Sequence, residues 1–311
     1  MVSEIPISQG ELPFGRAREC PCCGETMSQR LLDTSYFRCG RCGALASATD
    51  SAGYESDYYF HSAAAENGQR RRGALQWRWV QRLAREYPHG IDLAPRRTAV
   101  EFGCSRGYFV ETCLGHGLDI RGFDVSEVAI ASARARGLGA SCVRRDLSDH
   151  SDDAEIEPVS LVFAWELLEH FDDPAVLLNT ARRTLRLGGW LIGSTPNGQS
   201  SWIRLLGSSW HGFGIPQYHR TYLNPTALRQ VFERNKFGDI VTLTCVDWRD
   251  AHLLKHTATE LTKKAFGTSH IGMRAAVALT VGPFEKAAEL ASGRVGGLNG
   301  DTLLFAARRI A

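Results

Sequence analysis

Two acidic side chains and a glycine-rich turn in the middle of the chain have the types and spacing of a nucleoside-binding site. An apolar run ends in Glu101, and Gly103 and Gly107 follow in a short turn. After a helical pattern, a second apolar run ends in Asp124. Glycines let the backbone approach a ligand closely, and an acid at the end of the second strand can accept hydrogen bonds from both hydroxyls of a ribose. The stretch therefore predicts a strand–turn–helix–strand unit that binds a nucleoside.

Two other classes of protein use similar turns. A dinucleotide-binding fingerprint needs Gly-x-Gly-x-x-Gly, which this stretch does not contain. Gly103-x-Ser105-x-Gly107 does fit the Gly-x-Ser-x-Gly nucleophile elbow of α/β-hydrolases. In that fold, however, the elbow serine follows several strands, and an acid and then a histidine come after it. The turn here follows the first recognisable strand of the sheet and a cysteine cluster, so the order of elements disfavours a hydrolase.

Polar residues also follow the later apolar runs. Asp146 stands after the third, and Glu166, Glu169 and His170 stand after the fourth. His219 comes later, in a segment rich in Gly, Trp and Tyr. Because ligands bind at the carboxyl ends of the strands in open parallel sheets, we expect these side chains to share one rim with the glycine-rich turn.

Five of the nine cysteines fall near the N-terminus, where Cys20, Cys23, Cys39 and Cys42 form the pattern C-x2-C-x15-C-x2-C. That spacing is typical of two knuckles that hold one tetrahedral zinc ion. Disulfides are the alternative, and a reducing compartment argues against them. Four thiolates leave no open coordination position, so we expect a structural zinc, with Cys22 as a spare thiol.

Composition excludes several classes of protein. The 36 Lys and Arg residues nearly balance the 34 Asp and Glu residues, so no global field favours nucleic acid or a membrane surface. No run of about 18 apolar residues predicts a membrane span, and residues 1–10 lack the basic and apolar regions of a signal peptide. The sequence therefore predicts a soluble, cytoplasmic protein.

Strands and helices alternate along the chain, which indicates a parallel, doubly wound α/β sheet. The fourth strand is apolar throughout, as expected of a sheet that is buried on both faces. After the glycine-rich unit, the predicted strands cover 142–146, 158–165, 190–194, 239–246 and 302–307. The predicted helices cover 69–87, 126–136 (capped by Ser126) and 172–187, and a helical insertion covers about 251–297.

Several of these motifs resemble those of class I S-adenosylmethionine-dependent methyltransferases. Glu101-x-Gly103-x-Ser105-x-Gly107 resembles motif I of that family, with a serine where glycine is usual. Glu169-His170 before Asp172-Asp173-Pro174, Gly188-Gly189, Thr195-Pro196-Asn197 and the segment from His219 to Leu228 resemble later motifs, with Leu187 in place of a proline.

The N-terminal part is similar to a bacterial branch of the same family that carries a zinc-ribbon-like module before a tyrosine-rich segment, here residues 54–60. The resemblance covers about residues 20–60 and 98–240 and implies a seven-stranded Rossmann-like methyltransferase sheet that ends in an antiparallel strand pair. It implies three segments: a leader and four-cysteine zinc-ribbon-like module at 1–50, a linker and amphipathic helix at 51–97, and the methyltransferase domain at 98–311.

The resemblance further implies S-adenosylmethionine as the methyl donor. Asp146 matches the acid that reads the adenine amino group in that family. The residues expected to bind the cofactor are Glu101, Gly103, Ser105, Gly107, Asp124, Val125, Asp146, Leu147 and Trp165.

His170 and His219 are the candidate catalytic residues, because a hydroxyl acceptor must lose its proton and imidazole titrates near working pH. A metal is the alternative. Glu166-x-x-Glu169-His170 with a later histidine resembles the divalent-metal site of small-RNA 2′-O-methyltransferases and of ubiquinone-pathway O-methyltransferases. In such a site Mg²⁺ or Mn²⁺ would hold the acceptor hydroxyls.

Three functions stay open at this point. The first is methyl transfer to a hydroxyl of a small molecule such as a sugar, a natural product or a lipid precursor. The second is metal-assisted 2′-O-methylation of RNA, which the sequence does not favour, and nothing in it indicates DNA. The third is a non-catalytic cofactor-binding or partner-binding protein, which the intact acids Glu101, Asp124 and Asp146 argue against. The predicted helical insertion is also a candidate for a homodimer contact.

Overall fold

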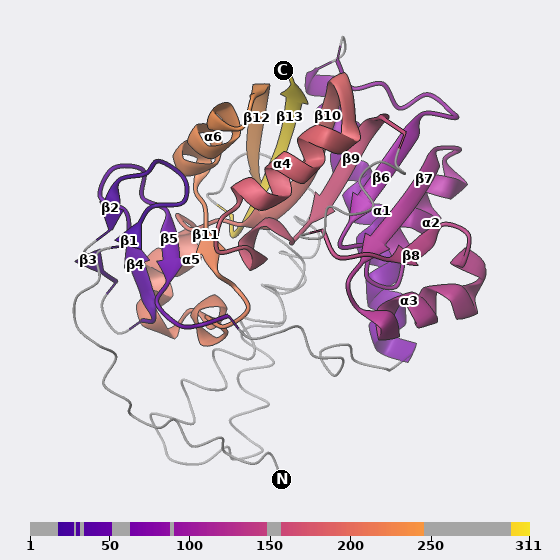
Figure 1. Cartoon of the computed structure of the whole chain (residues 1–311). Coiled ribbons are helices and arrows are strands. Elements are labelled where there is room, and N and C mark those ends of the chain that lie inside the picture. Colours follow the sequence, from indigo (N-terminus) through magenta and orange to yellow (C-terminus); the bar gives the residue numbers. More distant parts are fainter. Residues whose placement is uncertain are drawn as a thin grey trace.

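The computed structural model describes residues 18–27, 29–31, 34–51, 63–87, 90–147, 157–245 and 300–311 (Figure 1). The predicted leader, the tyrosine-rich segment 54–60 and the helical insertion at about 251–297 lie outside these residues. Within the described residues, no helix is both long enough and apolar enough to cross a lipid bilayer.

A seven-stranded sheet forms the centre of the molecule, in the order β12-β13-β10-β9-β6-β7-β8. Neighbouring strands from β8 to β10 run parallel, whereas β13 runs antiparallel to both of its neighbours, β10 and β12. This is the seven-stranded sheet with an antiparallel strand pair at its end that the resemblance implies. Its strands are β6 Thr98–Phe102, β7 Asp119–Asp124, β8 Cys142–Arg144, β9 Val159–Trp165, β10 Leu185–Pro196, β12 Phe237–Cys245 and β13 Thr302–Arg309.

Helices cover both faces of this sheet, which is why strand β9 is buried along its whole length. Val162 and Ala164 face the apolar cluster that contains α4 and α6, whereas Leu161 and Phe163 face the cluster that contains α1, α2 and α3. The alternation follows from the period of two along a strand. The helices are α1 Ala63–Glu86, α2 Tyr108–Gly115, α3 Glu127–Ala133, α4 Ala175–Thr184, α5 Ser201–Leu206 and α6 Pro225–Arg234.

Several helix boundaries differ from the sequence prediction, whereas a predicted cap is confirmed. Helix α1 begins at Ala63 rather than at 69, and α3 ends at Ala133 rather than at 136, where a π-helical turn follows. Helix α4 ends at Thr184, and residues 185–189, expected to finish the helix and break it, belong to β10. Leu185 is fully buried and pairs with Val159, and the strand register shifts before Trp190. Burial of this leucine in the sheet core outweighs its local helix preference. The predicted cap Ser126 accepts a hydrogen bond from the Ala129 amide at 3.2 Å, so α3 begins as expected.

The cysteine-rich part forms two small sheets beside the central one. Strand β5 pairs antiparallel with β11, which lies in the segment between the central strands β10 and β12 (Figure 1). Cys20 and Cys42 lie in the same apolar cluster as Leu228 and Val231 of α6. The boundary at residue 50 stays a prediction, and the cysteine-rich part shares its core with the sheet domain. Its strands are β1 Arg18–Glu19, β2 Thr26–Met27, β3 Gln29–Arg30, β4 Tyr36–Arg38 and β5 Leu45–Ser47, with β11 at Thr221–Tyr222.

Candidate active site

A cavity of about 610 Å³ opens at the carboxyl ends of the central strands. The glycine-rich turn and the acid–histidine group, far apart in the sequence, both line it, as the sheet topology predicts. Its lining includes Glu101, Gly103, Ser105, Asp124, Val125, Asp146, Leu147 and Trp165 of the expected cofactor residues, together with Glu166, Glu169, His170 and His219.

Asp124 holds the glycine-rich turn in place. Its Oδ2 accepts a hydrogen bond from the Ser105 amide at 2.7 Å, and its Oδ1 accepts one from the Ser126 amide at 2.9 Å. Ser105 has φ 50°, a left-handed conformation that glycine adopts without strain. This backbone conformation accounts for the glycine that is usual here in the resembling family.

Gly107 is the one expected cofactor residue that does not line the cavity. It has φ 74° and caps the start of α2. A Cβ atom there would lie 2.8 Å from the sulfur of Cys142 and 3.0 Å from Leu138. Gly107 therefore lets the turn pack closely against the strand behind it.

Glu101 carries a buried acceptor oxygen that a bound ligand would satisfy. The residue is 3% exposed, and its Oε2 has no hydrogen-bond partner among the described residues. Burial, and then the nearby Cys142 and Asp124, raise the pKa of the Glu101 carboxyl well above its ordinary value. Buried acceptors in native proteins are normally paired. A ligand with an ammonium group and ribose hydroxyls, such as S-adenosylmethionine, fits this lining.

Residues that sequence reasoning missed complete the cavity from other elements. Helix α1 contributes Gln69, Arg72 and Gln76, and the start of β13 contributes Asp301. The spacing of the three α1 residues places them on one face of a helix. This spacing is the sequence feature from which they could have been recognised as a group. Arg70, which lies between Gln69 and Arg72 on α1, pairs with Glu111 at the surface.

On the other side of the cavity, Glu169, His170 and His219 converge. One potential ligand atom from each lies within 4.8 Å of the others. The two imidazole rings meet edge to face, with their centroids 5.0 Å apart. Glu169 is 1% exposed, and its Oε2 accepts a hydrogen bond from the Thr195 hydroxyl at 3.0 Å. The sequence prediction thus brought together three side chains that the fold places in one group.

Each of the two rings has a hydrogen-bond partner at Nδ1. His170 Nδ1 lies 3.0 Å from the carbonyl oxygen of Tyr218, which can only accept, so Nδ1 carries the proton. His219 Nδ1 lies 2.9 Å from the hydroxyl of Tyr222, which itself donates to the Gly212 carbonyl. His219 Nδ1 is therefore also a donor. A proton on Nδ1 suits both of these contacts and would leave the lone pair of each neutral ring on Nε2, the arrangement of histidines that bind metals or accept protons.

His170 and Glu166, both on this rim, differ in their electrostatic surroundings. Burial lowers the pKa of His170 to about 4, against the opposing effect of the Tyr218 and Glu166 carbonyls. His170 is therefore neutral at pH 7 and a weak proton acceptor there. Glu166 stands outside the group of converging ligand atoms, and its Oε1 accepts a hydrogen bond from the Ser194 hydroxyl at 2.6 Å.

The predicted zinc ligands also converge. The sulfurs of Cys20, Cys23, Cys39 and Cys42 all lie within 4.8 Å of one another, and Cys22 is buried outside this group. The Cys20–Cys42 and Cys23–Cys39 sulfur pairs are each 3.5 Å apart. Four clustered sulfurs suit a tetrahedral structural zinc, and the buried Cys22 thiol lies against those of Cys20 and Cys42.

Comparison with known proteins gives relatives that agree with this geometry. Over 121 residues the chain is 31% identical to a ubiquinone biosynthesis O-methyltransferase of Hydrogenovibrio crunogenus, a match that covers 38% of this chain and 50% of that protein. The ubiquinone biosynthesis O-methyltransferase of Thiobacillus denitrificans is 32% identical over 126 residues, a match that covers 40% of this chain and 51% of that protein. The chain spans about half the length of the curated relatives it matches.

A chain in the solved complex between the Haloferax volcanii Trm112 methyltransferase activator and its methyltransferase shares the fold. It has 20% identity and a TM-score of 0.50, and the match covers 80% of this chain and 95% of that one. The fold and cavity are those of a class I S-adenosylmethionine-dependent methyltransferase. The chain belongs to the methyltransferase domain family, which it matches over residues 67–240, more than half of its 311 residues.

Proposed function

We propose that this enzyme methylates a hydroxyl group of a small molecule, and that Glu169, His170 and His219 hold a divalent metal at which the acceptor binds. The observation that carries the proposal is the convergence of these three side chains in the cavity that also contains the glycine-rich turn. The names of the ubiquinone biosynthesis O-methyltransferases support an oxygen acceptor.

In this proposal the cofactor occupies the half of the cavity formed by the turn. Asp124 would accept hydrogen bonds from the ribose hydroxyls, Asp146 from the adenine amino group, and Oε2 of Glu101 from the ammonium group of the amino-acid part. S-adenosylmethionine supplies an electrophilic methyl group. Catalysis then depends on holding the acceptor oxygen in line with it.

The other half of the cavity binds and deprotonates the acceptor. The side chains of Glu169, His170 and His219 offer one carboxylate oxygen and two imidazole nitrogens, a donor set that suits Mg²⁺, Mn²⁺ or Zn²⁺. A metal bound there would lower the pKa of a coordinated hydroxyl. Trp165, Phe171 and Trp210 line the same cavity and supply apolar surface for a ring-bearing acceptor.

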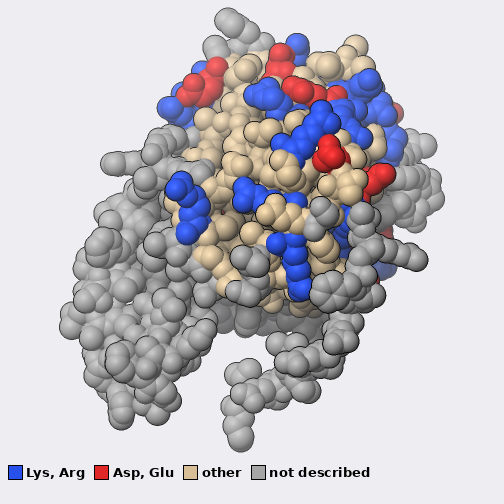
Figure 2. Space-filling view, turned by 90° about the vertical axis from the view of Figure 1, so that its left-hand side faces the viewer, with Lys and Arg blue, Asp and Glu red and all other residues tan. Residues whose placement is uncertain are grey.

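A small acceptor fits the surface better than RNA does. Figure 2 shows the face that carries the cysteine-rich part. Its lower area has separate Lys or Arg side chains on an otherwise uncharged surface, and acidic residues mix with basic ones toward the top. Among the described residues of this face there is no continuous basic stripe of the kind that tracks a phosphate backbone.

The decisive experiment measures release of S-adenosylhomocysteine with a panel of catechols, sugars and polyols as acceptors. We expect turnover with a hydroxyl acceptor, loss of turnover in EDTA, and recovery on addition of Mg²⁺ or Mn²⁺. Zinc content is measured after EDTA treatment, so that loss of the structural metal is not mistaken for loss of the catalytic one. Full turnover in EDTA with zinc retained would rule out the metal, and methylation only of amines or carbon would rule out the hydroxyl acceptor.

Replacing Asp124 by alanine should weaken S-adenosylmethionine binding about 10- to 100-fold, because the ribose loses a charged acceptor worth about 1.5–3 kcal/mol. Asp119 begins the same strand at the opposite edge of the sheet and is exposed, so Asp119→Ala is the matched control. Calorimetric titration of both variants, with thermal melts to exclude unfolding, measures the effect. Equal affinities in the two variants would show that Asp124 does not bind the cofactor.

A further inference from the structure

Arg220 connects the cysteine-rich part of the chain to the catalytic loops. Its side chain is 3% exposed. The guanidinium donates to the Thr49 carbonyl at 2.6 Å and to the Ser47 hydroxyl at 3.0 Å, at the end of β5 and just after it. It also donates to the Pro216 carbonyl at 2.8 Å and to the Asp172 carboxylate at 2.8 Å. One buried cation therefore ties three separate segments together.

The backbone of Arg220 continues the same connection. Its amide donates to the carbonyl of Glu169 at 2.6 Å, and its carbonyl accepts a hydrogen bond from the Ser47 amide at 2.8 Å. On either side of Arg220 lie His219 and β11, whose Thr221 pairs with Ala46 of β5. The order of contacts runs from the cysteine-rich part, through residues 219–222, to the turn that carries Glu169 and His170.

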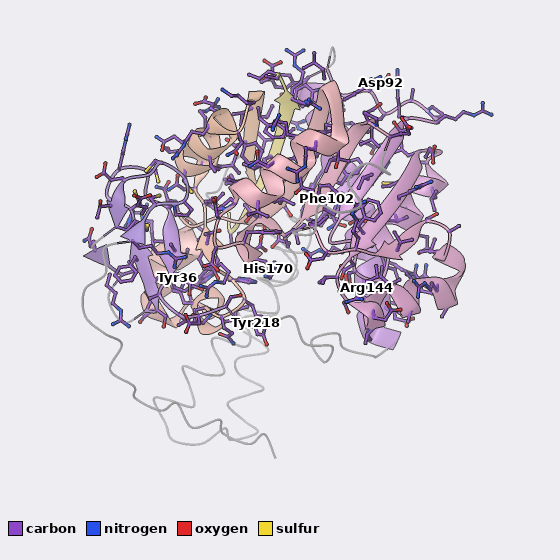
Figure 3. All side chains as sticks on the ribbon, in the orientation of Figure 1. Tyr36, Asp92, Phe102, Arg144, His170 and Tyr218 are labelled. Carbon is purple, nitrogen blue, oxygen red and sulfur yellow. The ribbon has the colours of Figure 1, made fainter. Side chains whose placement is uncertain are left out.

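Tyr36 makes a second contact of this kind. It is fully buried on β4, and its hydroxyl donates to the carbonyl of His219 at 2.8 Å. Its ring packs against that of Tyr222, at 5.2 Å between centroids, and the Tyr222 hydroxyl accepts the hydrogen bond from His219 Nδ1. Figure 3 shows His170 between Tyr36 and the central strands, with Tyr218 close by.

We propose that the four-cysteine module, residues 18–51, is a positioning device for the two catalytic histidines, acting through Arg220 and Tyr36. The proposal rests on the proposed function of His170 and His219. Residues 215–220 form turns rather than a helix or strand, so their conformation depends on the contacts around them. None of the contacts described here reaches Ser105, Asp124 or the rest of the cofactor turn. The module should therefore control methyl transfer separately from cofactor binding.

The test compares Arg220→Met with Arg234→Met in the full-length protein. Arg234 also joins the module to the domain, through a 3.2 Å hydrogen bond to the Cys22 carbonyl, but it lies on α6, away from the histidines. The readouts are zinc content, S-adenosylmethionine affinity by calorimetry, and nitrogen NMR spectra of the imidazole rings, which report the tautomer without any acceptor. Signals of His170 and His219 are assigned from the two alanine variants.

For Arg220→Met we expect zinc and cofactor affinity to stay within about twofold, while the Nδ1-protonated signals of both histidines give way to tautomer mixtures. Turnover should fall by about 100-fold, the effect of misplacing a catalytic group by about 1 Å. Arg234→Met should change neither spectrum. Tyr36→Phe, which removes one hydroxyl, should perturb His219 more than His170 and slow turnover about two- to tenfold.

Unchanged imidazole spectra in Arg220→Met, or the same changes in Arg234→Met, would overturn the positioning role. If Arg220→Met fails to fold, Tyr36→Phe decides the matter by the same spectra. If Arg220→Met changes the spectra but the alanine variants of His170 and His219 keep full turnover, the proposed function of the histidines is wrong. The two failures are therefore distinguishable.

Discussion

Alanine at His219 should lower methyl transfer by about 10²–10⁴-fold and leave S-adenosylmethionine affinity nearly unchanged. The reason is the division of the cavity: His219 lies with Glu169 and His170 on the acceptor side, and its Nδ1 bonds to Tyr222 rather than to any residue of the glycine-rich turn. Turnover is measured as S-adenosylhomocysteine release, and affinity by calorimetry.

His116→Ala is the matched control, since His116 is a surface histidine that stacks on Trp77, outside the cavity. Comparison with His170→Ala distinguishes the two chemical roles. If both rings bind a metal, the two alanine variants should lose similar activity, and Mn²⁺ should rescue neither fully. If His219 acts as a base without metal, its loss should be the greater one. Turnover that is indifferent to both substitutions would mean that the rings only shape the pocket.

Serine at Cys39 should abolish zinc binding, whereas alanine at Cys22 should retain about one zinc per chain. Cys39 contributes one of the four clustered sulfurs, and Cys22 is buried outside the cluster. Structural zinc stabilises small knuckles by about 10–16 kcal/mol, so the Cys39 variant should lose the local fold as well as the metal. Elemental analysis and a thermal melt measure the two effects.

The Cys22 variant provides the control within the same knuckle. It keeps an apolar side chain at a fully buried position, so its melting temperature should fall only slightly. Zinc retained by Cys39→Ser, or lost from Cys22→Ala, would contradict the assignment of ligands. If the module positions the histidines as proposed, the Cys39 variant should also lose turnover while it still binds S-adenosylmethionine.

Much of the fold could be predicted because its signals are local. The apolar run of β9 and the cap at Ser126 each depend on a few neighbouring residues. The end of α4 could not be predicted this way, because Leu185-Arg186-Leu187 suits a helix as well as a strand. Its conformation is decided by pairing with Val159, a contact between distant residues.

The candidate site shows the same limit. Glu101, Asp124 and the acid–histidine group could be found from motifs at strand ends. The spacing of Gln69, Arg72 and Gln76 indicates a shared helix face, but neither that face nor Asp301 could be assigned to the cavity, because their place in the fold depends on packing. The role of Arg220 could not be predicted either, because its side-chain partners lie in three segments that nothing in the local sequence connects.

The hydrogen bond from Tyr36 to His219 joins residues that are 183 positions apart in the chain. During synthesis the knuckle leaves the ribosome first, and its partner segment follows about 10 to 40 seconds later at ordinary elongation rates. In that interval Tyr36, Leu45 and the other apolar residues that later pack against β11 and α6 have nothing to cover them. The knuckle is therefore synthesised well before the segments that cover it, and we expect the supply of zinc during that interval to affect how much of the protein folds.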